Sequence, residues 1–529
     1  MLTSHRINLN WRASVLAASV ALCLFGTSAC TDRTAAANEA GTAASLYLQQ
    51  GNLPAAREAI NEALSQRDDI VELHLVRGRI ENAAGERGAA YDAYFNAMSL
   101  DPTNVEALSA VSQLGLALGN LDQSLDATDR LLTLDPNRTG ALVVRGLHEL
   151  VRRRYNSAVR YADRAIELAP QDENAYILKA RALFLKEDVR EALAVLENAA
   201  LVDKNTAPLA LTRLEIYREL EDADGMAEQF ASLRSTRPAD AELRLDEANL
   251  WFRRGEDAKA FGQILAAIEQ AEPGTDDDSL AASQIVRLID EYGTAGMTPV
   301  QRTRLRQLAT PTIARALARY YIVAGDYDEA LQLADKTPNL TKAALITQIK
   351  ALRGQAKSAR TDAERILAKD ETNCDALVAK SFAQRALADL DGAVQSGQRA
   401  STECPDVTAA YVAAAQAYDA WDRDAAVRRI YGQGIAANPQ NLMLYRKFVE
   451  WLESSGQDRR AIAVMRRFTR DSPSSLAGFE LYREVCARAG DSCAREAANE
   501  KARIATRYGL DLEPGQLQPN ALFGRFVRR

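Results

Sequence analysis

The sequence predicts an all-α protein assembled from repeated helical hairpins. The 529-residue chain is 47% apolar but only 6% aromatic, a balance that favours close helix packing over sheets. A 34-residue interval separates successive prolines in two stretches of the chain, at Pro102, Pro136 and Pro170 and again at Pro405, Pro439 and Pro473. Each interval has room for two helices and a turn, and the proline ends the second helix because it cannot continue it.

Small residues recur in phase with these prolines. One set lies in the first helix of each interval, at Gly78, Ser112, Gly146, Ala180 and Ala248. A second set lies in the second helix, at Ala90, Ser124, Ala158 and Ala192. A turn glycine falls between the two helices at Gly51, Gly85, Gly119 and Gly255, among others. The small side chains let the two helices of a hairpin approach closely, and glycine is suited to the tight turn.

This pattern resembles the tetratricopeptide repeat, most closely at residues 85–102 and 325–330. The resemblance covers nearly the whole mature chain and implies a right-handed superhelical solenoid of about fourteen helix–turn–helix units. The tryptophan usual near the start of the family's unit is replaced here, by His74, Leu108, Leu142 and Tyr176.

The repeat phase divides the chain into segments. It slips in the middle, because Pro238 and Pro405 lie 167 residues apart, three short of five periods. A polar stretch at residues 273–279 and a helix start at Thr298-Pro299 fall in this region. It is either a degenerate hairpin where the solenoid changes curvature or simply a divergent repeat. We expect a regular array at 37–272, the break at 273–310, a second array at 311–507 and an extended tail at 508–529 that is either disordered or docks on a partner or in the groove.

The first residues have the composition of an export signal. Arg6 and Arg12 precede an apolar run at residues 13–25, which is shorter than the ~20 residues of a membrane-spanning helix. We therefore expect residues 1–29 to be a signal peptide. The ending at 26–30 resembles the lipobox of bacterial lipoproteins, although Thr27 stands where leucine is usual. That resemblance implies acylation of Cys30, a linker at 30–36 and, because Thr31 is not aspartate, sorting to the outer membrane. The alternative is an ordinary signal peptide cut before an unmodified cysteine.

Four further cysteines fall into two local pairs in the repeat phase. Cys374 begins a first helix and Cys404 ends the second helix of the same unit. Cys486 ends one helix and Cys493 begins the next. Both pairs have the spacing that a disulfide accepts, and an oxidising compartment would form them. The alternative is four buried thiols.

The resemblance also implies a binding surface, because the family's first helices line a concave groove that holds peptides. The repeat phase places these residues on that groove: Leu75, Arg79, Leu116, Val143, Leu147, Leu150, Ile177, Arg181, Phe184 and Leu211. The lysine and asparagine set that clamps a terminal carboxylate is missing. The apolar stretch from Leu116 to Phe184, flanked by arginines, is typical of a site for an amphipathic segment. The alternative is that these side chains pack between neighbouring units.

Composition and motifs argue against several functions. The net charge is −7 with lysine and arginine spread throughout, which disfavours nucleic-acid binding. Three histidines are too few for a histidine metal centre or a common hydrolase triad, and phosphate-loop and metalloprotease motifs are missing. We expect no enzyme, cofactor, metal or small-molecule substrate.

Two functions remain, and both require protein partners in the cell envelope. The first is a periplasm-facing, lipid-anchored scaffold in pilus or secretion assembly, outer-membrane protein assembly or exopolysaccharide export. The alternative is a regulatory cofactor that binds and activates a periplasmic enzyme.

Overall fold

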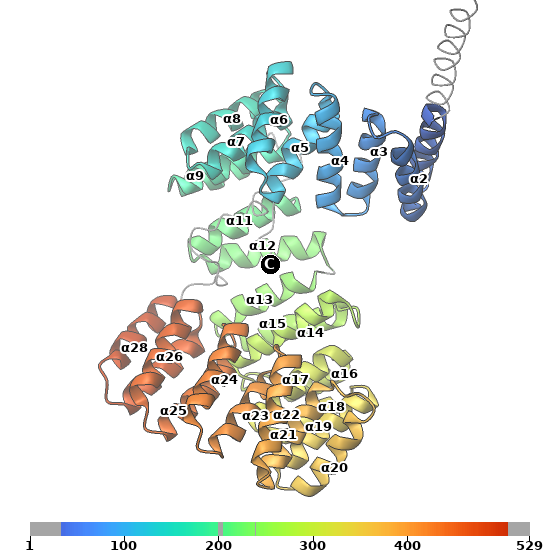
Figure 1. Cartoon of the computed structure of the whole chain (residues 1–529). Coiled ribbons are helices and arrows are strands. Elements are labelled where there is room, and N and C mark those ends of the chain that lie inside the picture. Colours follow the sequence, from blue (N-terminus) through green and yellow to red (C-terminus); the bar gives the residue numbers. More distant parts are fainter. Residues whose placement is uncertain (1–32, 199–204, 239, 506–529) are drawn as a thin grey trace, which may run out of the picture. The chain divides into compact units, whose positions relative to one another are not determined.

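The computed structural model describes residues 33–198, 205–238 and 240–505, and in these ranges it contains helices and turns but no strand (Figure 1). A helix at residues 33–49 and the 27 helices α2–α28 pair in chain order into fourteen hairpins. The protein is therefore the all-helical repeat solenoid that the sequence predicts. The segment expected to be a linker is helical from residue 33 onward, whereas the expected signal peptide, Cys30 and the tail at 508–529 lie outside the described residues.

The helices form two compact units, and the boundary between Thr212 and Arg213 falls inside α11. In unit 1 the helix at 33–49 is followed by α2 (Leu53–Gln66), α3 (Val71–Ala83), α4 (Arg87–Leu100), α5 (Val105–Leu118), α6 (Leu121–Leu134), α7 (Thr139–Val151), α8 (Tyr155–Leu168), α9 (Glu173–Leu185), α10 (Val189–Leu196) and the start of α11 (Ala207–Glu219). Odd-numbered helices from α3 onward are the first helices of their hairpins, and even-numbered helices are the second.

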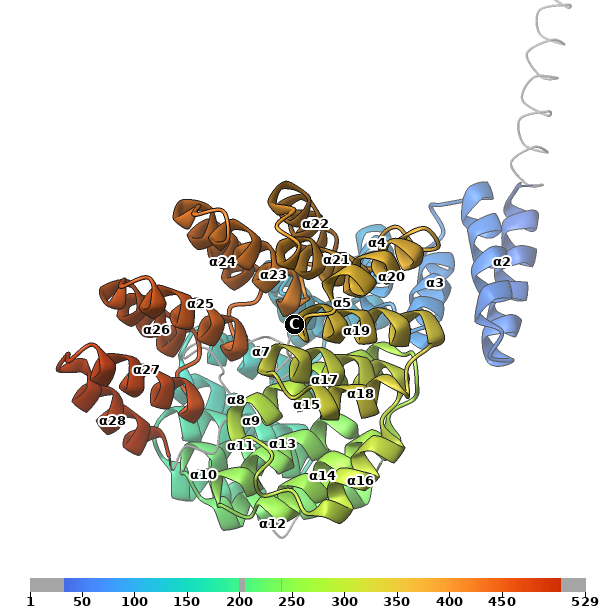
Figure 2. The ribbon, with the colours of Figure 1, turned by 90° about the horizontal axis from the view of Figure 1, so that it is seen from below.

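Unit 2 continues the same alternation. Its helices are α12 (Ala223–Thr236), α13 (Ala241–Arg253), α14 (Asp257–Gln270), α15 (Asp276–Tyr292), α16 (Pro299–Leu308), α17 (Pro311–Ala324), α18 (Tyr327–Ala334), α19 (Asn339–Leu352), α20 (Ala356–Leu367), α21 (Cys374–Ala386), α22 (Leu390–Glu403), α23 (Thr408–Asp419), α24 (Asp424–Ala437), α25 (Leu442–Ser454), α26 (Asp458–Asp471), α27 (Leu476–Arg488) and α28 (Cys493–Ile504). In Figure 2 the first helices from α15 to α27 follow the inner side of an arc and the second helices its outer side.

The repeated small residues work as the sequence predicts. A Cβ on Gly78 of α3 would lie 2.7 Å from the ring of Tyr94 on α4, so any larger residue would force this ring to move. Gly119 ends α5 with a φ of 82°, a left-handed conformation that glycine adopts at little cost. Both features lie within single hairpins and depend on no distant part of the chain.

The predicted break is a hairpin, with a long first helix and a short second one. α15 has 17 residues and α16 has 10. Thr298 forms a capping box with Gln301, and Pro299 occupies the first turn, which confirms the helix start predicted there. The phase slip itself falls one unit later, because α18 has only eight residues and Pro311 and Asn339 begin successive first helices.

Unit 2 also makes contacts between repeats that are far apart in sequence. α15 contacts both α25 and α27. All three are first helices, so the contact lies on the inner side of the arc. Apolar side chains from neighbouring hairpins otherwise form the core, which runs along the repeats as extended clusters. None of the described helices combines the length and the apolar character that a membrane crossing requires.

Candidate protein-binding surfaces

The predicted groove residues all lie on first helices of unit 1. Leu75 and Arg79 are on α3, Leu116 is on α5, Val143, Leu147 and Leu150 are on α7, Ile177, Arg181 and Phe184 are on α9, and Leu211 is on α11. Seven of the ten are at most 8% exposed; only Arg79, Phe184 and Leu211 are more accessible. Leu116 belongs to one core cluster with five α7 residues, Val143, Leu147 and Leu150 among them, as expected for side chains that join neighbouring units. Binding by the predicted groove remains a prediction that depends mainly on these three accessible side chains.

Arg79 is held between two helices. Its Nε and Nη2 donate to the carboxylate of Glu106 on α5 at 2.7 and 2.6 Å, and its Nη1 donates to Glu72 at 2.9 Å. The hydrogen bond to Glu106, followed by that to Glu72, raises the pKa of Arg79. The guanidinium therefore links α3 to α5, and its positive charge is paired with carboxylates of the same chain.

A buried polar cluster in unit 1 involves a histidine. Nε2 of His148 lies 2.8 Å from Oγ of Ser124, and that Oγ donates its proton to the carbonyl of Ser112 at 2.5 Å. His148 must then donate to Ser124 rather than take its proton, so this geometry does not activate the serine as a nucleophile. Burial, followed by the charges of Arg145 and Arg152, lowers the pKa of His148 to about 4. The sequence placed His148 and Ser124 in different helices and gave no sign that they meet.

The expected disulfides are present. Cys374 of α21 is bonded to Cys404 after α22 with Cα atoms 6.0 Å apart, and Cys486 of α27 is bonded to Cys493 of α28 with Cα atoms 5.6 Å apart. Each bond joins the ends of neighbouring helices. All four cysteines in the described ranges are therefore oxidised.

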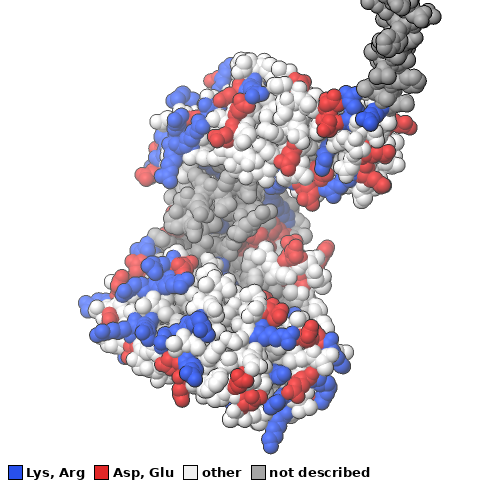
Figure 3. All heavy atoms as spheres, viewed as in Figure 1, with Lys and Arg blue, Asp and Glu red and all other residues white. Residues whose placement is uncertain are grey.

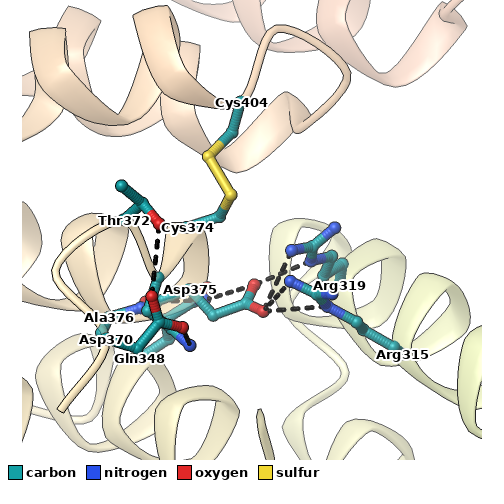
Figure 4. The surroundings of a disulfide bond; sticks show 10 residues. Arg315, Arg319, Gln348, Asp370, Thr372, Cys374, Asp375, Ala376 and Cys404 are labelled. Carbon is teal, nitrogen blue, oxygen red and sulfur yellow. Dashed lines mark hydrogen bonds and ion pairs between the residues drawn. A yellow bond between two sulfur atoms is a disulfide. The ribbon is translucent and has the colours of Figure 1, made fainter. Parts of the chain in front are cut away.

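A buried carboxylate lies beside the first disulfide (Figure 4). Asp375 is fully buried, and Arg319 and Arg315 of α17 donate to it at 2.7 and 3.2 Å. Gln348 of α19 donates to the same side chain at 3.1 Å. Burial opposes ionisation, but the two guanidinium groups, Arg319 foremost, hold the pKa of Asp375 below its usual range. This cluster joins three first helices on the inner side of unit 2.

The contact of α15 with α25 and α27 is the second long-range feature of unit 2. Asp290 accepts a hydrogen bond from the backbone amide of Met443 at 2.9 Å. Glu291 accepts from the amide of Ala477 at 3.0 Å and from Oγ of Ser475 at 2.6 Å. We refer to these contacts, with those of Arg253 described below, as the seam. The sequence signal that could have located it is the pair of adjacent acids near the end of α15.

The outer surface carries mixed charge. Figure 3 shows blue and red patches interspersed over both units. Many of these side chains form ion pairs with neighbours, such as Arg488 with Glu453 at 2.9 Å and Lys501 with Glu480 at 2.8 Å. Among the described side chains, no group of three or more histidines, cysteines or acids is arranged to hold a metal ion.

Comparison with known proteins supports the repeat assignment. A family model described as the tetratricopeptide repeat matches residues 42–105 and 143–208. Together with the fourteen hairpins, this match shows that the chain contains tetratricopeptide repeats and folds as a solenoid of them. No curated protein sequence matches the chain.

Solved structures with a similar helical arrangement match parts of the chain. PilF from Pseudomonas aeruginosa is 19% identical with a TM-score of 0.31, covering 39% of this chain and 94% of that one. PilW, described as a widely conserved type IV pilus biogenesis factor, is 21% identical with a TM-score of 0.33, covering 39% and 96%. The Naa15/Naa10 complex bound to HypK-THB gives 14% identity and a TM-score of 0.28, covering 88% and 80%. Likenesses at this level carry no argument about what this chain does.

Proposed function

We propose that the protein is a non-enzymatic scaffold that binds other proteins, exported from the cytoplasm and held at a membrane by a lipid on Cys30. The observation that supports it best is the continuity of the repeats: helical hairpins occupy the described chain from residue 33 to residue 504. A solenoid of this kind has much surface for its mass, and repeat proteins use such surfaces to bind other proteins.

The polar groups of the interior favour a structural role over catalysis. The carboxylates of Asp375, which is buried, and of Glu291, which is half-buried, are held by arginines, backbone amides or hydroxyls. His148 donates to a serine that is itself already hydrogen-bonded. These groups hold helices together and are not placed for catalysis. We therefore expect the surface of the protein to act by binding another chain.

Two features support export. The basic start, short apolar run and small residues before Cys30 are typical of a lipoprotein signal. Oxidation of all four described cysteines suits an oxidising compartment, because such bonds are rare in the cytosol. Within an envelope, the scaffold would serve pilus or secretion assembly, outer-membrane protein assembly or exopolysaccharide export.

The experiment that tests partner binding is in-cell crosslinking followed by affinity purification of the mature chain. Phe184→Glu and Leu211→Glu change two accessible side chains of the predicted groove. Leu168→Glu is the matched control, since Leu168 is 36% exposed on the second helix α8. Partners that are lost with the first two variants and kept with the control support groove binding. If wild-type protein captures no protein at fixed stoichiometry, the scaffold proposal is wrong.

The anchor is tested separately with Cys30→Ser. This variant cannot be acylated, so the acyl mass expected on the mature wild-type N-terminus should be missing from it. If the wild-type N-terminus itself carries no acyl mass, the lipid proposal is wrong.

A further inference from the structure

The seam joins two adjacent acids to equivalent positions in two successive repeats. Met443 is the second residue of α25, and Ala477, 34 residues later, is the second residue of α27. The backbone amides of a helix's first turn have no partner within the helix, and the helix dipole attracts negative charge there. Asp290 and Glu291 satisfy one amide each. The two adjacent acids at the end of α15 therefore bind the same position in two helices that are one repeat apart.

Arg253 of α13 adds three hydrogen bonds to the seam. Its Nη1 donates to the carbonyl of Ile504, its Nη2 to the carbonyl of Ser474, and its Nε to Oη of Tyr292. The Tyr292 hydroxyl in turn donates to Asn249 at 2.6 Å. One guanidinium thus connects α13 and α15 to the last two repeats of the unit.

The seam differs in character from the packing between neighbouring hairpins. Its lining is mostly polar, with Arg253, Arg287, Glu291, Gln440 and Ser475 among its residues. It borders a partly open pocket of about 50 Å³, which is large enough for water. Neighbouring hairpins instead share extended apolar clusters. Because the seam is polar, opening it exposes less apolar surface than parting two neighbouring hairpins would, so we expect it to open more readily than the packing between hairpins.

We propose that the seam is a reversible latch: unit 2 alternates between a closed ring, in which α15 caps α25 and α27, and an open arc with every hairpin intact. The closed ring turns its first helices inward and presents its second helices to solvent, as Figure 2 shows. The open arc gives a partner access to the inner side. This use of the latch rests on the proposed function, whereas the opening itself does not require a partner.

The test measures the distance across the seam by pulsed electron spin resonance. Labels are placed on the mature chain with Cys30→Ser, at Ser279→Cys on α15 and Ala463→Cys on α26, both of which are exposed. Glu291→Lys sets a cation against the first turn of α27 and should raise the population of long distances at least tenfold. Glu291→Gln keeps an acceptor and should stay closed, and Ser283→Lys, an exposed charge change on the same helix, is the matched control.

Circular dichroism checks that every variant keeps its helix content, which separates opening from unfolding. If folded Glu291→Lys protein gives the wild-type distance distribution, the seam is a static part of the fold and the proposal is wrong. That result would leave the scaffold function untouched. If wild-type protein captures no partner, the scaffold function is wrong, but the distance measurement across the seam still tests the latch.

Discussion

The carboxylate of Glu291 accepts a hydrogen bond from the backbone amide of Ala477, 186 residues further along the chain. Its neighbour Asp290 reaches the amide of Met443 across 153 residues. Contacts between non-adjacent units are unusual in a solenoid, whose repeats ordinarily touch only their neighbours. Unit 2 therefore has a stabilising contact that its repeats taken singly do not have, and this contact can be tested apart from the hairpins.

Lowering the pH should increase the closed population of unit 2. Burial raises the pKa of Asp290 to about 6, although Arg446 and the Met443 amide oppose this. Glu291 and Tyr320 also face the carboxylate. In the open arc Asp290 would titrate near its ordinary value of about 4, so closing takes up a proton between these values. Lowering the pH from 7.5 to 5 should therefore reduce the open population about tenfold, measured with the label pair across the seam.

Asp290→Asn is the control for this pH dependence. Its amide oxygen still accepts from the Met443 amide but does not titrate, so the distance distribution should be the same at both pH values. An open population that grows on acidification of wild-type protein would contradict the assignment of the proton to Asp290.

Unit 1 should respond to acid in the opposite direction. Burial lowers the pKa of His148 to about 4, whereas an unfolded histidine titrates near 6.5. The unfolded chain then binds more protons between these values, so stability falls as the pH drops through that window. We expect unit 1 to lose about 2 kcal/mol between pH 7.5 and pH 5. Hydrogen exchange of α7 during urea unfolding measures it, and His148→Gln, which keeps a donor for Ser124, should abolish this part of the pH dependence.

The two disulfides should contribute unequally to stability. Cys374 and Cys404 are 30 residues apart, and Cys486 and Cys493 are seven apart. By loop-closure entropy the larger loop stabilises by about 3.6 kcal/mol and the smaller by about 2.4 kcal/mol. Replacing each pair with alanines should therefore lower the urea midpoint of unit 2 more for the first pair. Equal losses, or a larger loss for the second pair, would show that native-state packing outweighs chain entropy.

Removing the buried carboxylate beside the first disulfide should be costly. Asp375→Ala leaves Arg319, Arg315 and Gln348 without their shared acceptor, and breaking a buried ion pair in this way costs about 3–5 kcal/mol. Asp391→Ala, at an exposed position on α22, is the control and should change stability by less than about 0.5 kcal/mol. Chemical denaturation of both variants decides the matter, and similar midpoints would show that the arginines find other partners.

Much of the fold could be predicted because its determinants are local. The approach of Gly78 to Tyr94, the cap at Thr298 and the bond between Cys374 and Cys404 each lie within one hairpin or its turn. The candidate site was harder to predict. Phase alone placed both Ile177 and Phe184 on the groove, yet Ile177 is 5% exposed while Phe184 is more accessible. Whether a groove residue is covered by the next unit depends on how neighbouring units are rotated relative to one another. The phase of the repeats in the sequence contains no such information.

The fourteen hairpins, their turns and the two cysteine pairs could be predicted from the sequence, because each depends on contacts within about one 34-residue period. The contacts of His148 with Ser124, of Asp375 with two arginines, and of α15 with α25 and α27 became visible in three dimensions alone. These contacts join different repeats. The seam in particular depends on small rotations between successive units that add up over more than 150 residues, so no single repeat specifies it.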